Sequence, residues 1–309
     1  TPRITETAKA LWYIYLTLTI ACGVAYWVAG MSAFDAIGHA FSTVAIGGFS
    51  THDASIGYFD SAGIELIAIV FMLLSGVNFA LHFAAVRNRR LTPYWRDMEF
   101  RTYLATLLVV SIVTISYLWL TKIFDSPTES MIEGLFQVVS IGTTTGFTTQ
   151  AYHSWPGFLP VLLLYLSFMG GCAGSTGGGI KVIRIVLLVK QGVRELRRLV
   201  HPSGQFAVKV NHKPVPNTVI EAVWGFFAAY FAISALMILL LMASGLDQET
   251  AFSAVAACLN NLGPGLGEVA QNFSSINDFS KWLLCLAMLL GRLEIFTLLV
   301  LLTPGFWKK

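Results

Sequence analysis

The chain contains 309 residues, of which 55% are hydrophobic and only 12% are charged, and its mean hydropathy is +0.68. Because a soluble protein normally carries about 25% charged residues, this composition predicts a surface that largely faces lipid. The net charge of +3 is too small to indicate nucleic-acid binding. The four cysteines lie far apart, without a CxxC pair or neighbouring histidines, which argues against a disulfide framework or a zinc site.

Apolar stretches long enough to cross a bilayer, about 20 residues each, alternate with shorter and more polar segments. The predicted crossings are 8–30, 62–86, 102–121, 157–190, which glycines interrupt, 217–244 and 282–303. The shorter segments lie between the first and second, the third and fourth, and the fifth and sixth crossings. The chain starts with Thr1-Pro2-Arg3, which is neither an initiator Met nor a signal peptide, and we therefore expect a longer parent polypeptide.

Loop charge predicts the orientation of the crossings. Basic residues gather in the connections 87–101 and 190–213 and in the last two residues, whereas acidic residues gather near the shorter segments. Since basic loops stay in the cytoplasm, we expect both ends of the chain to be cytoplasmic. Each shorter segment then dips into the membrane from the opposite side and returns. Non-helical backbone at that depth is tolerated only where it is buried in protein or lines a watery cavity.

The three dips are copies of one unit. Segments 34–51, 128–149 and 248–269 each read as a short helix, a few small or polar residues, and a final Gly-Phe or Gly-Leu. Aligning the final glycines pairs Gly48, or alternatively Gly47, with Gly146 and Gly265. The sequence thus predicts three parallel helix–pore loop–helix repeats, which are 1–90, 91–200 and 201–309.

The glycine-rich ends of the dips are typical of a cation filter. Glycine reaches backbone angles that other residues avoid, so consecutive carbonyl oxygens can face one side and replace the hydration shell of an ion. The short helices would also aim their partially negative C-terminal ends at the cavity. Uncharged side-chain oxygens are expected as further ligands from Thr143, Thr144, Thr145, Asn260 and Asn261. Without carboxylates, such a site favours a monovalent cation over Ca²⁺ or Mg²⁺.

The predicted filter residues are Val44, Ala45, Ile46, Gly47, Gly48, Gly142, Thr143, Thr144, Thr145, Gly146, Asn261, Leu262, Gly263, Pro264 and Gly265. The alternative is that the three segments are extracellular hairpin loops of a generic transporter. One Gly-Phe-Thr-Thr segment would favour that alternative. Three copies at matching positions favour a pore.

The fourth crossing contains a glycine-rich segment at 170–181. Each glycine costs about 1 kcal/mol in a helix interior relative to alanine, so we expect the helix to break here. A nucleotide-phosphate loop would need Gly-Lys-Ser/Thr after a strand, which this segment lacks. Two interpretations remain open, a GxxxG helix-packing face and a flexible intramembrane loop that obstructs ion flow. The predicted gating residues are Gly170, Gly171, Gly174, Ser175, Thr176, Gly177, Gly178, Gly179, Lys181 and Arg292.

Arg292 falls near the middle of the sixth crossing, where a charge costs several kcal/mol unless it faces protein or water. Glu294, two residues away, lies on another helix face and is a poor partner. We therefore expect Arg292 to face the pore below the filter, where it limits cation dwell time or holds the glycine-rich segment by hydrogen bonds. His39 and His82 are interpreted as structural residues, and Asn78 either lines the pore or bridges helices.

Five motifs together resemble the Trk/Ktr/HKT superfamily of potassium transporters, specifically the bacterial TrkH/TrkG type. They are FSTVAIGGFST, SIGTTTGFTT, GGCAGSTGGGIKV, NNLGPGLGEV and GRLEIFT. The resemblance implies an all-α, K⁺ channel-like fold with four helix–pore loop–helix repeats around one pore, of which this chain carries the second to fourth. It also implies filter glycines at Gly48, Gly146 and Gly265, a gating loop at 170–181, and a pore arginine at Arg292.

For function, the resemblance implies potassium uptake, with symport as an associated property, across the bacterial inner membrane. It implies a homodimer in the lipid bilayer and a cytoplasmic TrkA-type regulatory ring. Nucleotides, NAD(H) or ATP/ADP, are expected on that partner only, with K⁺ as the transported ion, no covalent cofactor and no nucleic acid. A secondary transporter with broken helices is the main alternative. An intramembrane enzyme is disfavoured, because the sequence has no HExxH, GxSxG or intramembrane carboxylate pair.

Overall fold

The computed structural model describes residues 2–301 and 303–307. These residues form helices and loops, apart from one β-hairpin with two residues in each strand. The first elements along the chain are α1 (Pro2–Val28), α2 (Ala33–Val44), η1 (Ser55–Phe59), α3 (Ala62–Ser75) and α4 (Phe79–Asn88). The next are α5 (Thr92–Arg96), α6 (Met98–Leu120), α7 (Pro127–Gly142), η2 (Tyr152–Ser154), α8 (Leu159–Met169) and α9 (Val182–Val200). The last are β1 (Lys209–Val210), β2 (Lys213–Pro214), α10 (Asn217–Ala243), α11 (Gln248–Leu259), η3 (Gly267–Val269), α12 (Asp278–Arg292), α13 (Ile295–Leu301) and α14 (Pro304–Trp307).

The three short helices α2, α7 and α11 begin in the same way. Each has a polar N-cap residue whose side chain accepts a hydrogen bond from the first turn, and each carries an acidic residue in that turn. The caps are Ser32, Ser126 and Asp247. Such caps satisfy backbone N–H groups that have no partner within the helix, and the acids complement the positive end of its dipole. Local sequence alone therefore starts these helices where the dips were predicted.

Only part of the predicted set of crossings consists of straight helices. Within the described residues, three are long and apolar enough to span a membrane, namely residues 8–28 of α1, and the whole of α6 and α10. The predicted crossing 62–86 is wrong as a continuous helix, because α3 and α4 meet at 92°. Asn78 lies in this bend and caps α4 by accepting from the Ala80 N–H at 2.8 Å, a role that the sequence did not predict.

The other two crossings that follow a dip are also broken. The predicted interruption of 157–190 is confirmed, since α8 ends at Met169 and α9 begins at Val182. Helix α9 then continues to Val200, beyond the predicted limit. In the sixth crossing α12 and α13 meet at 108°. Residue 302 of that crossing and the basic tail residues Lys308 and Lys309 lie outside the described residues.

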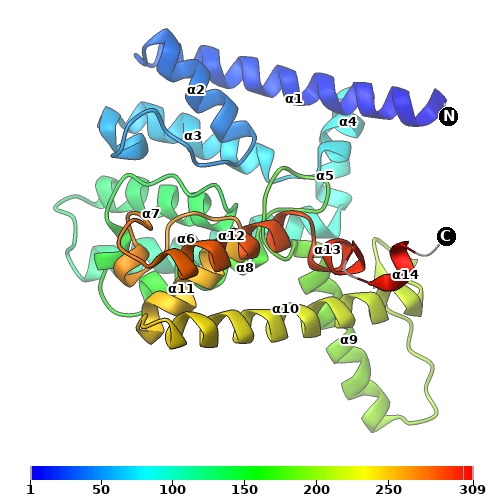
Figure 1. Cartoon of the computed structure of the whole chain (residues 1–309). Helices are drawn as coiled ribbons and strands as arrows, with labels where there is room; N and C mark the ends of the chain where they lie inside the picture. The colour runs from blue at the N-terminus through cyan, green and yellow to red at the C-terminus, as the bar shows by residue number, and fades with distance from the viewer. Residues whose placement is uncertain (1, 302, 308–309) are drawn as a thin grey trace.

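The helices pack in successive layers (Figure 1). Helices α1 to α3 form the upper layer of the view, α6 to α8 and α12 lie in the middle, and α10 and α11 lie below them. Helix α3 packs against α7 of the next layer, and α8 packs against α11. The start of α1, the end of α4, helix α9 and helix α14 all lie toward the right of the view. The elements that carry most basic residues therefore share one end of the molecule, opposite the starts of α2 and α11.

Candidate functional site

The helices α2, α7 and α11 end in the same backbone turn. The first residue past the capping residue adopts a left-handed conformation in each case, at Ile46 (φ 54°), Thr144 (φ 67°) and Asn261 (φ 55°). The next N–H then donates at 2.8 Å to the carbonyl five residues earlier, from Gly47 to Ser42, Thr145 to Ser140 and Leu262 to Ala257. This 6→1 bond is the Schellman motif. Left-handed φ is unfavourable for β-branched residues such as isoleucine and threonine, so the surroundings must hold these turns in place.

The glycine that follows each turn defines the register of the three copies. These glycines are Gly48 (φ 68°), Gly146 (φ 84°) and Gly263 (φ 105°). The predicted pairing of Gly265 with the other two is therefore wrong by two residues. The third copy has glycines on both sides of Pro264, and alignment on the last glycine selected the wrong one. Residues 259–263 are thus equivalent to 44–48 and 142–146, because the left-handed turn occupies the same position after each short helix.

The predicted filter segments, 44–48, 142–146 and 259–263, touch one another in chain order through these glycines. A β-carbon on Gly48 would lie 2.0 Å from the Thr145 carbonyl oxygen, and one on Gly146 would lie 2.0 Å from the Leu262 carbonyl oxygen. Neither position accepts a side chain without displacing the next segment. A β-carbon on Gly263 would meet nothing within 4 Å. The three segments are therefore arranged in order, each glycine facing the carbonyl of the next segment, and the third glycine faces open space.

The first copy has a matching open side. Phe49 follows Gly48 and is 81% exposed, whereas Phe147, at the equivalent position, is fully buried and packs with residues of α1, α2 and α3. On α2, the apolar residues Phe34, Ile37 and Phe41 are 76%, 57% and 57% exposed. Large apolar side chains at this spacing form one face of a helix. The contacts between the first and second copies and between the second and third copies are therefore closed. The outer faces of the first and third copies remain uncovered.

Three of the predicted side-chain ligands make hydrogen bonds within the protein. The Thr143 hydroxyl donates to the Val139 carbonyl and pairs with the Thr145 hydroxyl, both at 2.7 Å. The Asn260 amide accepts from Tyr230 at 2.7 Å and donates to Ser167 at 2.9 Å. The expectation that Thr143, Thr145 and Asn260 add side-chain oxygens stays a prediction, because the hydrogen bonds of these side chains within the protein compete with an ion. Their side chains brace the backbone from behind, which leaves the backbone carbonyls as candidate ligands.

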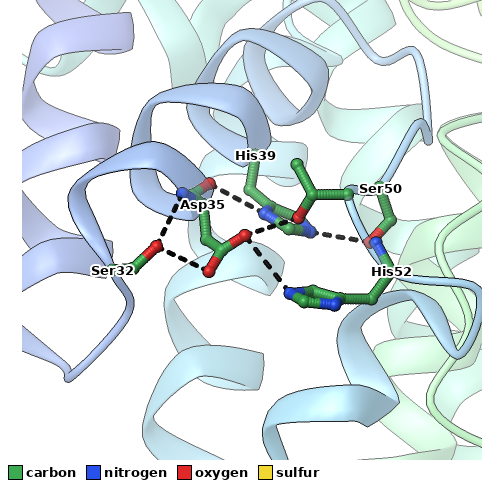
Figure 2. Close-up of polar contacts among 6 residues, drawn as sticks. Ser32, Asp35, His39, Ser50 and His52 are labelled. Atoms are coloured by element: carbon green, nitrogen blue, oxygen red, sulfur yellow. Dashed lines mark hydrogen bonds and ion pairs between the residues drawn. The ribbon is translucent and has the colours of Figure 1, made fainter.

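A polar network holds the outer end of the first copy (Figure 2). The Asp35 carboxylate accepts from the Ser32 hydroxyl at 2.7 Å and the Thr51 hydroxyl at 2.6 Å, and lies 3.2 Å from His52. Hydrogen bonds from Ser32 and then Thr51 hold the pKa of Asp35 below its usual value. The buried His39 contacts the Asp35 carbonyl through Nδ1 and the Ser50 hydroxyl through Nε2. The network joins the start of α2 to the end of its filter segment.

The histidines have structural hydrogen bonds at both ring nitrogens. In His39, Nδ1 lies 2.8 Å from a carbonyl oxygen and must donate, so Nε2 accepts from Ser50. In His82, Nε2 donates to the Leu74 carbonyl at 2.9 Å and Nδ1 accepts from Tyr94 at 2.7 Å. Both therefore fit a neutral imidazole with its donor and acceptor satisfied, which agrees with their predicted structural role.

The glycine-rich segment 170–181 lies across the inner ends of all three short helices. The Thr176 hydroxyl donates to the Val44 carbonyl at 2.8 Å, the Gly178 N–H donates to the Thr144 hydroxyl at 2.7 Å, and the Gly179 N–H donates to the Asn260 carbonyl at 3.1 Å. The segment is not helical, which excludes the helix-packing interpretation of its glycines. It also bonds the α3–α4 bend, from Cys172 to Gly76 and from Phe79 to Gly174.

Arg292 is the last residue of α12 rather than the middle of a straight helix. Its Nη1 donates to the Thr176 carbonyl at 3.4 Å, so it reaches the segment that contacts the three helices. Glu294 pairs instead with Arg184, at 2.7 Å. Lys181 donates to the Gly177 carbonyl. A cavity of about 200 Å³ opens between this segment, α10 and α12, and its lining includes Lys181, Arg184 and Arg292.

Sequence analysis missed three residues of this region. Gly291 allows α12 to approach α11 closely, because a β-carbon there would lie 2.0 Å from the Leu259 carbonyl oxygen. The buried Tyr152 donates to the Gly265 carbonyl at 3.1 Å. Glu99 is only 7% exposed and bonds the segment 170–181. For Glu99, the one signal in the sequence was a carboxylate at the start of an apolar helix. Such a residue is also explained by the positive end of the helix dipole.

The chain matches known proteins over its whole length. The family model described as "TrkH: Cation transport protein" matches residues 1–308. The chain is 59% identical to the Trk system potassium uptake protein TrkH of Vibrio parahaemolyticus, 55% to TrkH of Escherichia coli and 44% to TrkG of Escherichia coli. Each alignment covers 100% of this chain and 64% of the relative, so the chain spans less than two thirds of the length of these relatives.

A solved structure agrees with these matches. The crystal structure of the potassium transporter TrkH from Vibrio parahaemolyticus superposes with a TM-score of 0.95 at 59% sequence identity, covering 100% of this chain and 66% of that chain. The predicted fold class, an all-α membrane protein of the K⁺ channel-like kind, is confirmed. The chain belongs to the TrkH family of cation transport proteins.

Proposed function

We propose that this chain lines a K⁺ uptake pathway across the bacterial inner membrane. The contact of each filter glycine with the next segment carries the proposal, since Gly48 faces the Thr145 carbonyl and Gly146 faces the Leu262 carbonyl. Side-chain-free backbone arranged in sequence around one axis presents carbonyl oxygens that can replace an ion's hydration shell. The names of the relatives, potassium uptake proteins, identify K⁺ as the candidate ion.

The proposed ligands are backbone carbonyls of 44–48, 142–146 and 259–263. Strain supports this assignment, because Ile46 and Thr144 keep positive φ although both are β-branched. Conformations of this kind cost of order 1–3 kcal/mol and are concentrated at functional sites. The side chains behind the segments, such as Thr143 and Asn260, hold the carbonyl direction fixed.

A fourth equivalent unit closes the ring in this proposal. A β-carbon added to Gly263 would meet nothing within 4 Å, and Phe49 and one face of α2 are exposed apolar surface. The unit would place a filter carbonyl against Gly263, as the second unit does against Gly48. It would also cover Phe49, as the first unit covers Phe147. The shorter length of the chain relative to its relatives leaves room for such a unit.

The segment 170–181 and Arg292 form the gate in this proposal. The segment lies on the inner side of the filter, and hydrogen bonds of 2.7 to 3.1 Å join it to each of the three short helices. Its glycines allow it to change shape at low steric cost. The positive charge of Arg292 would shorten cation residence beneath the filter.

The basic end of the molecule faces the cytoplasm in this proposal, following the positive-inside rule. A homodimer and a cytoplasmic TrkA-like ring that binds nucleotides are proposed from the family resemblance alone. The basic connections around α9 and the β-hairpin would then lie on the surface that such a ring approaches.

Isotope uptake by the complete polypeptide in liposomes tests the proposed function. We expect uptake of labelled K⁺ that excess unlabelled K⁺ suppresses strongly and equimolar Na⁺ suppresses much less. Liposomes with protein heat-inactivated before reconstitution serve as the control. Uptake without cation preference, or no uptake above the control, would contradict the proposal.

A further inference from the structure

A single carboxylate oxygen ties together the two ends of the segment 170–181. Glu99 is 7% exposed, and its Oε1 accepts from the Ala173 N–H at 2.7 Å and from the Ile183 N–H at 3.1 Å. Ala173 lies near the start of the segment, and Ile183 lies in the first turn of α9, just after its end. Hydrogen bonds to a charged acceptor are roughly twice as strong as neutral ones, so Glu99 is a strong attachment point.

The same turn of α6 receives the β-hairpin. Asn211 lies in the turn between β1 and β2, accepts from the Met98 N–H and donates to the Asp97 carboxylate, both at 2.8 Å. Asp97 in turn caps α6 by accepting from Phe100 at 2.8 Å. The consecutive residues Asp97, Met98 and Glu99 therefore join the hairpin on one side to the glycine-rich segment on the other.

The hairpin is suited to hold its contact residue firmly. Asn211 and His212 both have positive φ, 48° and 66°, as a two-residue hairpin turn of the I′ type requires. A second bond, from Lys190 of α9 to the Lys209 carbonyl at 2.8 Å, fixes the first strand. The hairpin thus contacts α6 and α9, the two helices whose starts Glu99 joins to the segment.

We propose that Glu99 is a positioning residue that holds the segment 170–181 beneath the filter, and that the hairpin turn at Asn211 keeps Glu99 in place. A shift of the hairpin on the basic end of the molecule would then loosen the segment without any contact to the filter. This inference rests on the proposed function, whose gate it connects to a cytoplasmic element. A shift of about 1 Å suffices, because it lengthens the Asn211 bonds beyond the distance of a hydrogen bond.

Thiol labelling of the complete polypeptide tests this coupling without measuring transport. Cys172 lies within the segment and is fully buried, so its rate of maleimide labelling reports movement there. Substituting the exposed Cys285 by serine removes a background signal. The buried Cys22 and Cys258 are internal controls for general loosening of the fold.

We expect Glu99→Ala to raise the labelling rate of Cys172 about tenfold or more, as loss of hydrogen bonds to a charged group implies. Glu99→Gln keeps an oxygen that can accept both bonds but lacks the charge, so its rate should lie between those of the unsubstituted protein and Glu99→Ala. Asn211→Ala should raise the rate in the same direction by a smaller factor. The exposed Glu221→Ala on α10 and Lys213→Ala in the hairpin are matched controls and should change nothing.

An unchanged Cys172 rate in both Glu99→Ala and Asn211→Ala would overturn the proposal. Equal rises at Cys22 and Cys258 would also overturn it, because Glu99 would then support the fold in general. In liposomes, Glu99→Ala should raise total K⁺ flux while leaving the K⁺/Na⁺ ratio unchanged. If the unsubstituted protein showed no K⁺ preference, the proposed function would fail, but the labelling result would still decide the coupling.

Discussion

The Gly178 N–H donates to the Thr144 hydroxyl at 2.7 Å, which connects the glycine-rich segment directly to the left-handed turn of the middle filter copy. A β-carbon on Gly178 would lie 2.1 Å from the Asn260 carbonyl oxygen, so the same residue also lies against the third copy. Filter and segment therefore form one packed unit.

Gly146→Ser is expected to reduce discrimination between K⁺ and Na⁺. The new side chain would displace the Leu262 carbonyl, which lies 2.0 Å from the position of its β-carbon, and the adjacent carbonyls would lose their orientation. Competition uptake assays in liposomes measure the effect. Gly192→Ser, in an open position on α9, is the control, and an unaltered ion preference in Gly146→Ser would count against the filter assignment.

Gly263→Ser is expected to reduce K⁺ preference in the complete polypeptide, as Gly146→Ser does. Gly263 has the positive φ of the filter glycines, and in a closed ring its β-carbon would meet the carbonyl of the fourth unit. Gly265→Ser should instead lower stability, since its β-carbon would lie 2.7 Å from the Val269 side chain. Uptake and thermal unfolding in detergent distinguish the two. Normal selectivity in Gly263→Ser would contradict both the register and the closed ring.

Deleting several residues within 174–179, or Arg292→Ala, is expected to raise K⁺ flux. The deletion removes hydrogen bonds such as that from Thr176 to Val44, and the substitution removes both the bond to Thr176 and a positive charge near the pathway. Tracer uptake with the complete polypeptide measures the change. Lys281→Ala, near the start of the same helix α12, is the control. If neither change alters flux, the segment serves packing alone.

Acid is expected to weaken the outer end of the first copy through Asp35. Hydrogen bonds from Ser32 and Thr51 hold the pKa of Asp35 below its ordinary value of 3.8, so the carboxylate stabilises the folded state above that pH. This contribution is lost as the pH falls from 3.8 through the lowered folded-state pKa. Thermal unfolding of Asp35→Asn should therefore depend less on pH in this range than that of the unsubstituted protein. Identical profiles would show that Asp35 makes no such contribution.

The sequence alone was sufficient for the features that depend on local chemistry. Composition and apolar length predicted the membrane class, the repeated pattern of 34–51, 128–149 and 248–269 predicted three short helices, and the glycines of 170–181 predicted a helix break. Capping, glycine cost and apolar length act over a few residues. They are therefore visible without knowledge of the fold.

Only the tertiary structure decided the features that depend on contacts between distant residues. Gly263 rather than Gly265 is equivalent to Gly48 and Gly146, because the turn at the end of α11 fixes its position. The side chains of Thr143 and Asn260 are held by hydrogen bonds to Val139, Tyr230 and Ser167. Glu99 finds its partners 74 and 84 residues away. Such partners are chosen by packing of the whole chain, and neither propensity nor periodicity encodes that choice.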